Sequence, residues 1–370
     1  MRVHIVDPSA FTPPYDHALS SALARAGVEV ELITSRFPYG AVPSPDGYEV
    51  RELFYRRAAG AWAGTRPRAR VAAKLAQHVP DMLRYRAVAR EADVVHFQWL
   101  PVQALDRWLL PARPTVLTAH DLLPREPRPG QARAQRRLYD AVDAVVVHSG
   151  YGRQLLVSSL AVDPTKVRVI HHGAFEHLTR LGRELPLPDD LAEVRAPVVL
   201  FFGLLRPYKG LETLLEAWRG VEGAELWIVG RPRMDVSALR ALAGSSVRFV
   251  PRFVSDGELP AFFRRADVVV LPYARTERLD WSGVLATALA FGKPTVVSDV
   301  GGFGELAALG AARLVAPDDP DALRAALVGL LDDPQERSRL ASGALSAAEG
   351  AYSWDAAAHE TLALYRDLVG

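Results

Sequence analysis

The sequence VVLFFGLLRPYKGLETLLEAW occupies residues 198–218 and decides the fold. It begins with a continuous apolar run, Val198–Phe202, which is typical of a strand buried on both faces of a parallel sheet. A glycine-containing turn follows, and Leu211–Trp218 has the residue spacing of an amphipathic helix. Strand, turn and helix in this order form the repeating unit of a doubly wound α/β domain.

The same alternation of apolar runs and helical patterns continues on both sides of this segment. In the first half of the chain we predict strands at Val3–Val6, Val28–Thr34, Val94–Phe97, Thr115–Thr118, Ala144–His148 and Val167–His171. In the second half we predict strands at Val198–Phe202, Glu225–Val229, Val247–Val250, Val268–Leu271 and Thr295–Ser298. A polar, proline-containing stretch near 174–197 separates the two runs. We therefore expect an α/β protein with two Rossmann-like domains and parallel sheets, one over 1–180 and one over 181–350.

Composition excludes several classes of protein. The chain has 370 residues, 49% of them hydrophobic, which is enough for two cores and argues against disorder. It has no cysteine, so a disulfide framework, a cysteine-ligated metal and a thiol nucleophile are excluded. No apolar run is long enough to span a membrane, and MRVHIVDPSAF at the start lacks the apolar core of a signal peptide. We expect a cytoplasmic protein, and peripheral contact with the inner membrane face stays open.

The formal net charge of +1 conceals an uneven distribution of charge. Residues 1–180 carry +7 and residues 181–370 carry −6. The positive excess lies in residues 51–91, which hold ten Lys and Arg against three acids, and also Trp62. Such a basic, partly amphipathic segment is suited to anionic lipid, although a solvated face explains it equally well. We expect no nucleic-acid partner, because no recognition motif accompanies the charge.

Two segments of the second half are suited to an anionic ligand. Ligands of doubly wound sheets bind where strands end, and with two domains the cleft between them is the expected place. After Val198–Phe202, Gly203 allows close backbone approach, and Arg206 and Lys209 lie beside the start of a helix, as in an anion site. The alternative is a glycine turn with two solvated cations.

The second segment is Ser282-Gly283-Val284, which precedes the apolar helix predicted at Leu285–Phe291. Its backbone N–H groups suit a phosphate or ribose oxygen, and the alternative is plain helix capping by Ser282. Gly292-Lys293-Pro294 then reads as the end of that helix rather than as part of a site.

In the first half, polar and aromatic side chains also follow strands. His120 comes shortly after Thr115–Thr118, where a cleft-facing position is expected, although an isolated histidine there is more often structural. His96 and Trp99 lie at the end of another strand and suit an aromatic platform for a sugar or lipid acceptor, with core packing as the alternative. Tyr15 and Asp16 belong to a proline-stiffened segment after the first strand.

No metal site is expected. Asp319 and Asp321 form an Asp-x-Asp pair, but they precede the helix predicted at Ala322–Leu331, where acidic residues cap the N-terminus. His171 and His172 are adjacent in a strand and point to opposite faces, so they do not form a two-histidine site.

The order of these motifs resembles glycosyltransferase family 4. The resemblance rests on Gly203…Arg206…Lys209-Gly210, Gly230-Arg231, Ser282-Gly283, Gly292-Lys293-Pro294 and Asp299-Val300-Gly301-Gly302. It implies a GT-B fold, a retaining enzyme that uses a nucleotide sugar as substrate, and no metal or other cofactor. Residues 351–370, with Tyr352-Ser353-Trp354-Asp355, resemble the family's last helix, which crosses back to the N-terminal domain.

The resemblance also implies roles for individual residues. Arg206 and Lys209 would stabilise the leaving diphosphate, and His120 would contact the donor sugar near the reacting carbon without acting as a general base. The other expected donor-binding residues are Gly203, Arg231, Arg252, Phe253, Ser282, Gly283 and Val284. Tyr15 and Asp16 stand near a glycine pair of the relatives, and we expect them on the acceptor side with His96 and Trp99.

One departure from the family concerns its pair of glutamates. The corresponding positions hold Leu279 and Thr287, and the chain resembles a subset with Ser-Gly in this motif. Asp280 and Glu277 lie beside the first position, and we expect one of them, Asp280 above all, to replace the missing carboxylate.

The predicted function is transfer of a hexose from a UDP- or GDP-sugar to a carbohydrate, lipid-linked or small-molecule acceptor. Two alternatives stay open. A GT-B sugar-nucleotide epimerase would need acid and base carboxylates that the sequence does not place, and a non-catalytic nucleotide-sugar binder would fit the missing glutamate pair.

Overall fold

The computed structural model describes residues 1–38, 40–57, 67–124 and 129–370, and the side chains of all of these except 67–71. The chain divides into two compact units. Unit 1 consists of residues 1–173, 278–280 and 354–370, and unit 2 of residues 174–277 and 281–353. Each unit is built around one parallel sheet, as the sequence predicts.

In the described part of unit 1, seven parallel strands form a sheet in the order β3-β2-β1-β4-β5-β6-β7. Their bounds are β1 (Arg2–Asp7), β2 (Glu29–Thr34), β3 (Glu49–Glu52), β4 (Val94–Phe97), β5 (Thr115–Thr118), β6 (Ala144–Val147) and β7 (Val167–Val169). The central strands β4, β5 and β6 are buried along their whole length because helices cover both faces of the sheet.

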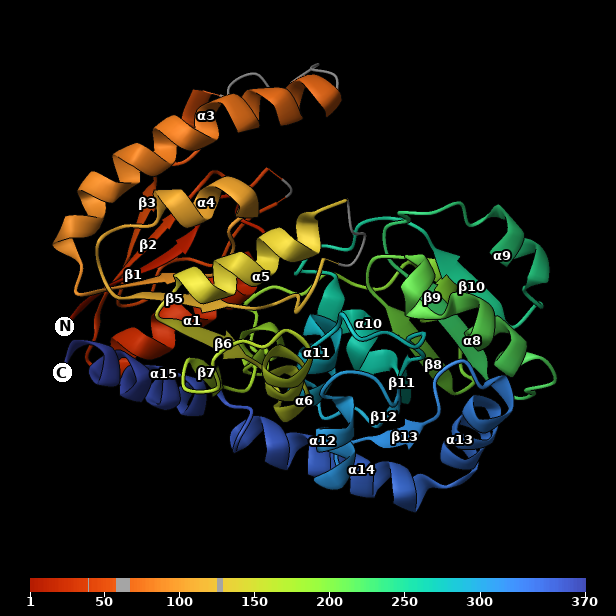
Figure 1. The fold of residues 1–370 in the computed structure, drawn as a ribbon. Helices are drawn as coiled ribbons and strands as arrows, with labels where there is room; N and C mark the ends of the chain where they lie inside the picture. Colours follow the sequence, from red (N-terminus) through yellow and green to blue (C-terminus); the bar gives the residue numbers. More distant parts are fainter. Residues whose placement is uncertain (39, 58–66, 125–128) are drawn as a thin grey trace. The chain divides into compact units, whose positions relative to one another are not determined.

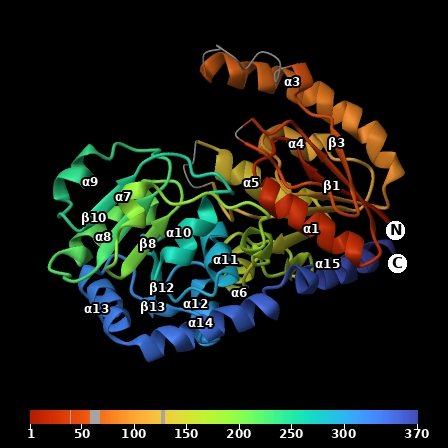
Figure 2. The same cartoon turned by 180° about the vertical axis from the view of Figure 1, so that it is seen from behind.

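The helices of unit 1 are α1 (Pro13–Arg25), α3 (Pro67–Val88), α4 (Gln103–Leu109), α5 (Gln131–Ala141), α6 (Gly150–Gln154) and α15 (Trp354–Val369), with short η1 (Ala89–Glu91) and η2 (Leu155–Ser159). Buried side chains of α3 and α5, including Met82 and Leu138, form one core with the strands. Helix α15 packs against α1 and β4, so the end of the chain belongs to unit 1. Figure 1 and the reverse view in Figure 2 show α15 alongside α1 and the two termini near each other.

In unit 2, six parallel strands form a sheet in the order β10-β9-β8-β11-β12-β13. Their bounds are β8 (Val198–Phe202), β9 (Glu225–Val229), β10 (Val247–Val250), β11 (Val268–Leu271), β12 (Thr295–Ser298) and β13 (Arg313–Val315). The order reverses between β8 and β11, and in sheets of this kind the carboxyl ends of the strands at such a reversal form the ligand site.

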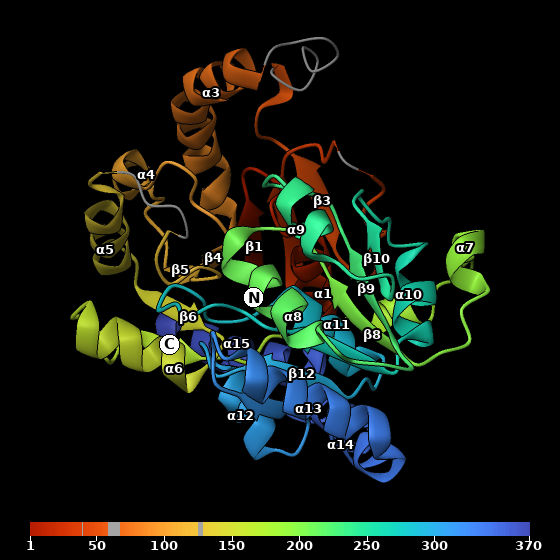
Figure 3. The same cartoon turned by 90° about the vertical axis from the view of Figure 1, so that its right-hand side faces the viewer.

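The helices of unit 2 are η3 (Glu176–Thr179), α7 (Asp189–Ala192), η4 (Pro207–Lys209), α8 (Leu211–Trp218), α9 (Ser237–Leu242), α10 (Leu259–Arg265), α11 (Gly283–Ala290), α12 (Phe303–Ala308), α13 (Pro320–Asp332) and α14 (Pro334–Glu349). One core joins the apolar sides of α8, α9 and α13 to the strands. Helix α13 packs beside α8, as Figure 3 shows.

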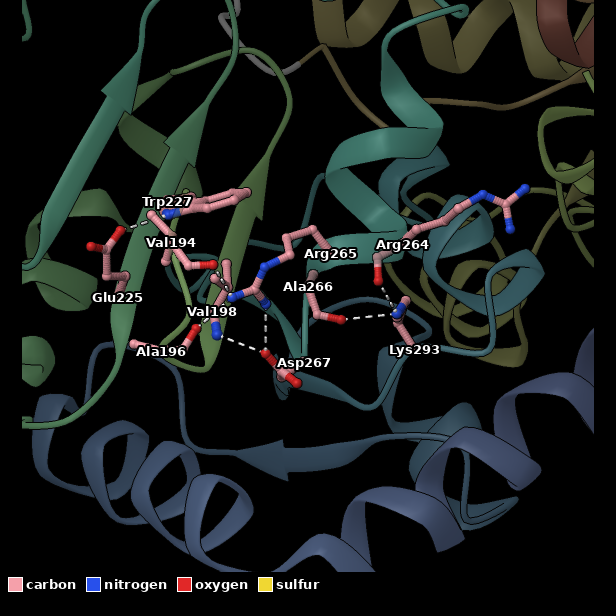
Figure 4. A network of polar contacts seen from close by, with 10 residues as sticks. All are labelled: Val194, Ala196, Val198, Glu225, Trp227, Arg264, Arg265, Ala266, Asp267 and Lys293. Atoms are coloured by element: carbon pink, nitrogen blue, oxygen red, sulfur yellow. Dashed lines mark hydrogen bonds and ion pairs between the residues drawn. The ribbon is translucent and has the colours of Figure 1, made fainter. Parts of the chain in front are cut away.

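The amino ends of the two sheets share a repeated arrangement. Asp93, Asp143 and Asp267 each precede a strand, and each accepts a hydrogen bond of 2.8 Å from the first N–H of the neighbouring strand. Figure 4 shows the third case, in which Asp267 accepts from Val198 N–H and pairs with Arg265. These aspartates help to fix the register of paired strands at their amino ends. The carboxyl ends of the strands are not involved in these contacts.

Two lysines support the same ends. Lys166 donates to the carbonyls of Asp140 and Val142, and Lys293 donates to those of Arg264 and Ala266 (Figure 4). A cation at a helix C-terminus satisfies carbonyls that the helix leaves without partners. Gly292 has a left-handed φ of +57°, so the interpretation of Gly292-Lys293-Pro294 as a helix end is confirmed.

The predicted strands and their order in the chain are confirmed, and two strands were missed. Both are edge strands: β3 (EVRE) is polar and largely exposed, and β13 (RLV) is short. An edge strand is buried on fewer sides, so it lacks the apolar run that marks the central strands. Strand β6 ends at Val147 rather than His148, and β7 ends at Val169 rather than His171. His148, His171 and His172 therefore lie beyond the strands, and the prediction that His171 and His172 are adjacent within a strand is wrong.

Candidate functional site

The candidate diphosphate site of unit 2 lies at the carboxyl ends of β8 and β11. Gly203 directly follows β8 with a φ of +116°. A Cβ at this position would lie 3.4 Å from the Lys209 Nζ and 3.1 Å from the Val284 Cγ2. Glycine therefore leaves room for the lysine head and the start of α11 against the end of the strand.

Lys209 is nearly enclosed, with 6% of its surface exposed. It closes the turn η4, and Gly210 follows it with a φ of +68° and begins α8. The Lys209 ammonium donates to the hydroxyl of Tyr273, and its Nζ lies 4.5 Å from the centre of the Tyr273 ring. A buried lysine needs such partners because removal of a cation from water is costly.

Ser282 occupies the N-cap position of α11, as predicted, but its side chain accepts no hydrogen bond from the helix backbone. Its Oγ instead lies 3.0 Å from the Tyr273 hydroxyl. The alternative interpretation of Ser282 as a plain capping residue is therefore wrong. Gly283 and Val284 begin α11, and the Val284 side chain and the Lys209 head both lie beside Gly203.

The remaining predicted donor-binding residues of unit 2 are more open. Arg206 is partly buried and Arg231 is exposed. Arg252 donates to Glu258 at 2.6 Å and to the Phe253 carbonyl at 3.0 Å, and this contact lowers the pKa of Glu258 to about 2. The ion pair holds the loop after β10 in place, and the Phe253 ring on that loop is half exposed.

Asp280 does not have the position that we expected for a substitute ribose ligand. It belongs to unit 1, is completely buried, and accepts hydrogen bonds from the backbone N–H of His148 and the hydroxyl of Ser149. A Cβ on Gly152 would lie 2.7 Å from its Oδ1, so the start of α6 closes over the carboxylate. Asp280 thus ties residues 278–280 to β6 and α6, and the prediction of a donor contact is corrected.

The other positions of the altered motif also differ from a glutamate pair. Leu279 is buried in unit 1, and the Thr287 hydroxyl donates to the Gly283 carbonyl within α11 at 2.9 Å. Glu277 belongs to unit 2 and is exposed. Of the two carboxylates that we considered as substitutes, Glu277 is the accessible one.

The candidate site residues of unit 1 gather around His120. The Trp99 ring stacks on the His120 ring with centres 5.1 Å apart and planes 17° apart, and Tyr15 meets His120 edge-on at 4.6 Å. Tyr15 also contacts the rings of His148, His172 and Trp354. His120 is partly exposed, whereas Tyr15 is buried. The His120 ring therefore reaches the surface while it packs against the aromatic rings of Trp99 and Tyr15.

Burial keeps the histidines beneath His120 uncharged. It lowers the pKa of His148 to about 4 and that of His172 to about 3. The His148 Nδ1 donates to the Ile170 carbonyl at 3.0 Å, and its Nε2 lies 3.4 Å from the His120 Nδ1. The region of unit 1 that contains His120 is therefore rich in rings and poor in charge.

Tyr15 and Asp16 support this region from α1. Burial raises the pKa of Tyr15 and, with Asp7 nearby, raises that of Asp16 well above its usual value. Thr12 accepts from Trp99 Nε1 at 2.9 Å and donates to Asp16 at 3.2 Å, so Asp16 indirectly orients the Trp99 ring. Because Tyr15 is enclosed by rings, its predicted direct contact with acceptor is corrected to a supporting one. Asp16 also lines a cavity of about 50 Å³ in unit 1.

His96 is buried in the core of unit 1. Its Nδ1 lies 2.6 Å from the Tyr365 hydroxyl of α15, and its Nε2 lies 2.7 Å from the Thr118 hydroxyl. With both ring nitrogens engaged and no exposed surface, His96 cannot form part of an acceptor platform. That prediction is corrected: His96 holds α15 to β4 and β5.

The chain matches two family models that together cover most of both units. Residues 15–174 match Glycosyltransferase Family 4, and residues 196–333 match Glycosyl transferases group 1. A D-inositol 3-phosphate glycosyltransferase of Nocardioides sp. is 30% identical over 94% of this chain and 83% of its own length. The chain belongs to glycosyltransferase family 4. The corresponding enzyme of Kineococcus radiotolerans is 29% identical over 95% of this chain and 89% of its own length.

Solved structures show the same fold. Sucrose-phosphate synthase from Thermosynechococcus elongatus has a TM-score of 0.74 at 21% identity, covering 100% of this chain and 99% of its own. HepE of Anabaena in complex with UDP-glucose has a TM-score of 0.72 at 20% identity, covering 98% of this chain and 100% of its own. The fold of this family 4 member is GT-B, and its general activity is glycosyl transfer.

Sequence reasoning missed Tyr273 and His148. Both stand immediately after strands, Tyr273 two residues beyond β11 and His148 one residue beyond β6. A systematic inspection of the residues that follow strands would have found Tyr273. His148 was hidden because the apolar pattern extended the predicted strand by one residue.

The Asp-x-Asp sequence is a helix cap, as predicted. Asp319 accepts from Ala322 N–H at 2.9 Å, and Asp321 pairs with Arg324 at 3.2 Å. Within the ranges that the structure covers, no group of three or more His, Asp and Glu side chains is arranged to hold a metal ion. None of the helices in the described part of the chain has the length and apolarity to cross a bilayer.

The basic segment 51–91 is only partly described. Trp62 and Arg66 lie outside the described residues, and so do the side chains of Arg68 and Arg70. Farther along α3, basic residues Arg84 and Arg86 are exposed together with Leu83. On α4, Trp108 is 69% exposed and lies under the guanidinium of Arg107 at 4.3 Å.

Proposed function

We propose that this family 4 enzyme is a retaining hexosyltransferase that uses a UDP- or GDP-sugar. The observation that carries the proposal is the buried Lys209 ammonium held against Gly203 at the carboxyl end of β8. A fixed cation beside the start of α11 suits a diphosphate leaving group. Solved HepE complexes contain UDP and UDP-glucose, which supports a nucleotide-sugar donor.

In the proposed reaction, the bond between the sugar anomeric carbon and the diphosphate oxygen breaks while a bond to the acceptor oxygen forms on the same face. The leaving phosphate takes the proton of the acceptor hydroxyl, so no side chain need act as a base. Lys209 and Arg206 stabilise the developing negative charge, and His120 positions the donor sugar. We propose that this chemistry needs no metal ion.

The other donor contacts follow from the arrangement of unit 2. Ser282, Gly283 and Val284 offer backbone N–H groups and a hydroxyl to phosphate, and the loop of Arg252 and Phe253 receives the nucleobase. Glu277 takes the place of the missing ribose-binding carboxylate because it is exposed, whereas Asp280 is enclosed. We propose an acceptor hydroxyl on a carbohydrate, a lipid-linked saccharide or a small molecule.

We propose in addition that the basic segment contacts anionic membranes from the cytoplasmic side. Exposed arginines of α3 beside exposed Leu83 would bind lipid headgroups and acyl chains together. Cosedimentation with vesicles containing 30% anionic lipid tests this. Binding that disappears when Arg84, Arg86 and Arg90 are changed to Gln supports the proposal, and no binding to such vesicles contradicts it.

The function is tested by measuring nucleoside diphosphate release from a panel of UDP- and GDP-sugars with mixed acceptors, with and without EDTA. We expect one donor to be consumed and the α or β configuration of its anomeric carbon to be retained in the product by NMR. Conversion of the donor to an epimer would indicate the epimerase alternative. Tight donor binding without turnover of any acceptor would indicate a binding protein.

A further inference from the structure

Lys209, Tyr273 and Ser282 form a chain of polar contacts at the candidate diphosphate site. The Lys209 ammonium donates to the Tyr273 oxygen, and the Tyr273 hydroxyl lies 3.0 Å from the Ser282 Oγ. The three residues come from η4, the segment after β11, and the N-cap of α11. All three are buried, and Tyr273 is 2% exposed.

The chemistry of these groups sets the direction of the first contact. A lysine ammonium has hydrogens to donate and no lone pair to accept, so the Tyr273 oxygen is the acceptor of the first bond. The Tyr273 and Ser282 hydroxyls are close enough for a second hydrogen bond, in which either oxygen can be the donor. When Tyr273 donates, the Ser282 oxygen accepts and the Ser282 hydrogen points away from Tyr273. The Ser282 oxygen accepts no hydrogen bond from the backbone of α11. A donor at the start of a helix suits an anionic oxygen.

The Tyr273 ring is held by its neighbours. It packs against Phe303 at 5.5 Å and edge-on against Tyr208 at 5.9 Å, and its centre lies 4.5 Å from the Lys209 Nζ. A ring clamped in this way cannot turn without disturbing the core. Tyr273 therefore presents its hydroxyl to the Lys209 ammonium from a fixed position.

We infer that Tyr273 is a positioning residue for the donor diphosphate. It holds the Lys209 ammonium at the end of β8 and orients the Ser282 hydroxyl so that its hydrogen is donated to the terminal phosphate of the nucleotide. This inference rests on the proposed function, because it presupposes a nucleoside diphosphate ligand. Tyr273 lies outside the recognised motifs, and in this role it pre-organises the two phosphate contacts made by Lys209 and Ser282.

The test compares binding of the nucleoside diphosphate and the matching monophosphate by calorimetry. For Tyr273→Phe, which keeps the ring and removes the hydroxyl, we expect the diphosphate Kd to rise about tenfold, the typical effect of losing a hydrogen bond to a charged group. The monophosphate Kd should change less than about twofold, because that ligand lacks the terminal phosphate. Equal losses for both ligands would show a structural role only and would overturn the inference.

Ser282 provides an independent variant if Tyr273→Phe does not fold. Ser282→Ala should show the same selective loss of diphosphate affinity, and Ser282→Thr, which retains a hydroxyl, should restore it. The double variant should lose no more than about the larger single effect, since the two groups act in series. Additive losses, or unchanged diphosphate affinity in Ser282→Ala, would contradict the chain.

Tyr85→Phe is the matched control. Tyr85 is a fully buried tyrosine of unit 1 whose hydroxyl lies 3.4 Å from His4, and its loss should leave nucleotide affinity unchanged. If the wild-type protein binds no nucleoside diphosphate, the proposed function itself fails. If the wild type binds it and Tyr273→Phe binds it equally well, only the role of Tyr273 fails.

Discussion

The candidate site residues of the two units differ in charge, although both groups stand at the carboxyl ends of parallel strands. In unit 1, the His120 ring stacks on the Trp99 ring, and burial keeps His148 and His172 neutral. In unit 2, a lysine ammonium is enclosed between a tyrosine and a glycine turn. A neutral ring surface suits a sugar, whereas a fixed cation suits a diphosphate.

The amino ends of the same sheets show no such difference. Asp143 and Asp267 receive the same backbone hydrogen bond, and Lys166 and Lys293 satisfy the same kind of helix carbonyls. The two units thus have similar hydrogen bonds at the amino ends of their strands and differ at the carboxyl ends. This contrast supports placing the proposed functional chemistry at the carboxyl ends of the strands, and it does not depend on any single motif.

The strongest test of this contrast between the two units is to remove the Lys209 ammonium from unit 2. Lys209→Ala should reduce kcat/KM for the donor by about 10²-fold or more, because a cation on a developing anion is removed. Steady-state kinetics measures the effect. Lys293→Ala is the control of the same residue type: it should lower the free energy of unfolding by about 1 kcal/mol and leave kcat/KM nearly unchanged. Equal effects of the two changes on activity would remove the distinction between the two ends of the sheet.

The corresponding test in unit 1 is His120→Ala. We expect kcat to fall by about 10-fold to 10²-fold, since the donor sugar loses a positioning contact. The Kd of the nucleoside diphosphate should stay within about twofold of the wild-type value, because His120 is expected to contact the sugar alone. A large loss of diphosphate affinity in this variant would mean that the division of labour between the two units is wrong.

A third test separates the two carboxylates of the altered motif. Asp280→Asn should lower the free energy of unfolding by about 1–3 kcal/mol, because the amide nitrogen that replaces one carboxylate oxygen cannot accept the hydrogen bond that this oxygen receives. Donor KM measured on the folded protein should change little. Glu277→Gln should behave in the opposite way, with a higher donor KM and unchanged stability in urea. The reverse pattern would reinstate Asp280 as the ribose ligand.

The smallest expected effect is the pH dependence contributed by a buried histidine. Burial lowers the pKa of His96 to about 3, whereas a histidine in the unfolded chain has its ordinary pKa of 6.5. Between these values the unfolded chain binds a proton that the folded chain does not, so stability falls as pH falls below 6.5. Relative to His96→Gln, wild-type protein should lose about 1 kcal/mol more per pH unit between about pH 6 and pH 4.

Denaturant unfolding of both proteins at several pH values measures this difference. Asp7 and Asp16, whose pKa values are raised by burial, act in the opposite direction, but both proteins contain them and their contribution cancels. Parallel stability curves would show that His96 is not buried in its neutral form.

The sequence predicts the central strands well because their burial on both faces requires continuous apolar runs. It misses β3 and β13 because edge strands carry no such requirement. Among site residues, Lys209 and Ser282 could be found because glycines and helix starts surround them. Asp280 could not be placed correctly, since its contacts with His148 and Ser149 join segments more than 130 residues apart.

The most direct test of the account is calorimetric titration of wild-type protein, Lys209→Ala and His120→Ala with UDP and GDP. This division of roles between Lys209 and His120 predicts that one of these nucleotides binds the wild type, that Lys209→Ala loses at least about tenfold in affinity, and that His120→Ala keeps wild-type affinity. It is contradicted if neither nucleotide binds the wild type, or if Lys209→Ala binds the nucleotide as tightly as the wild type does.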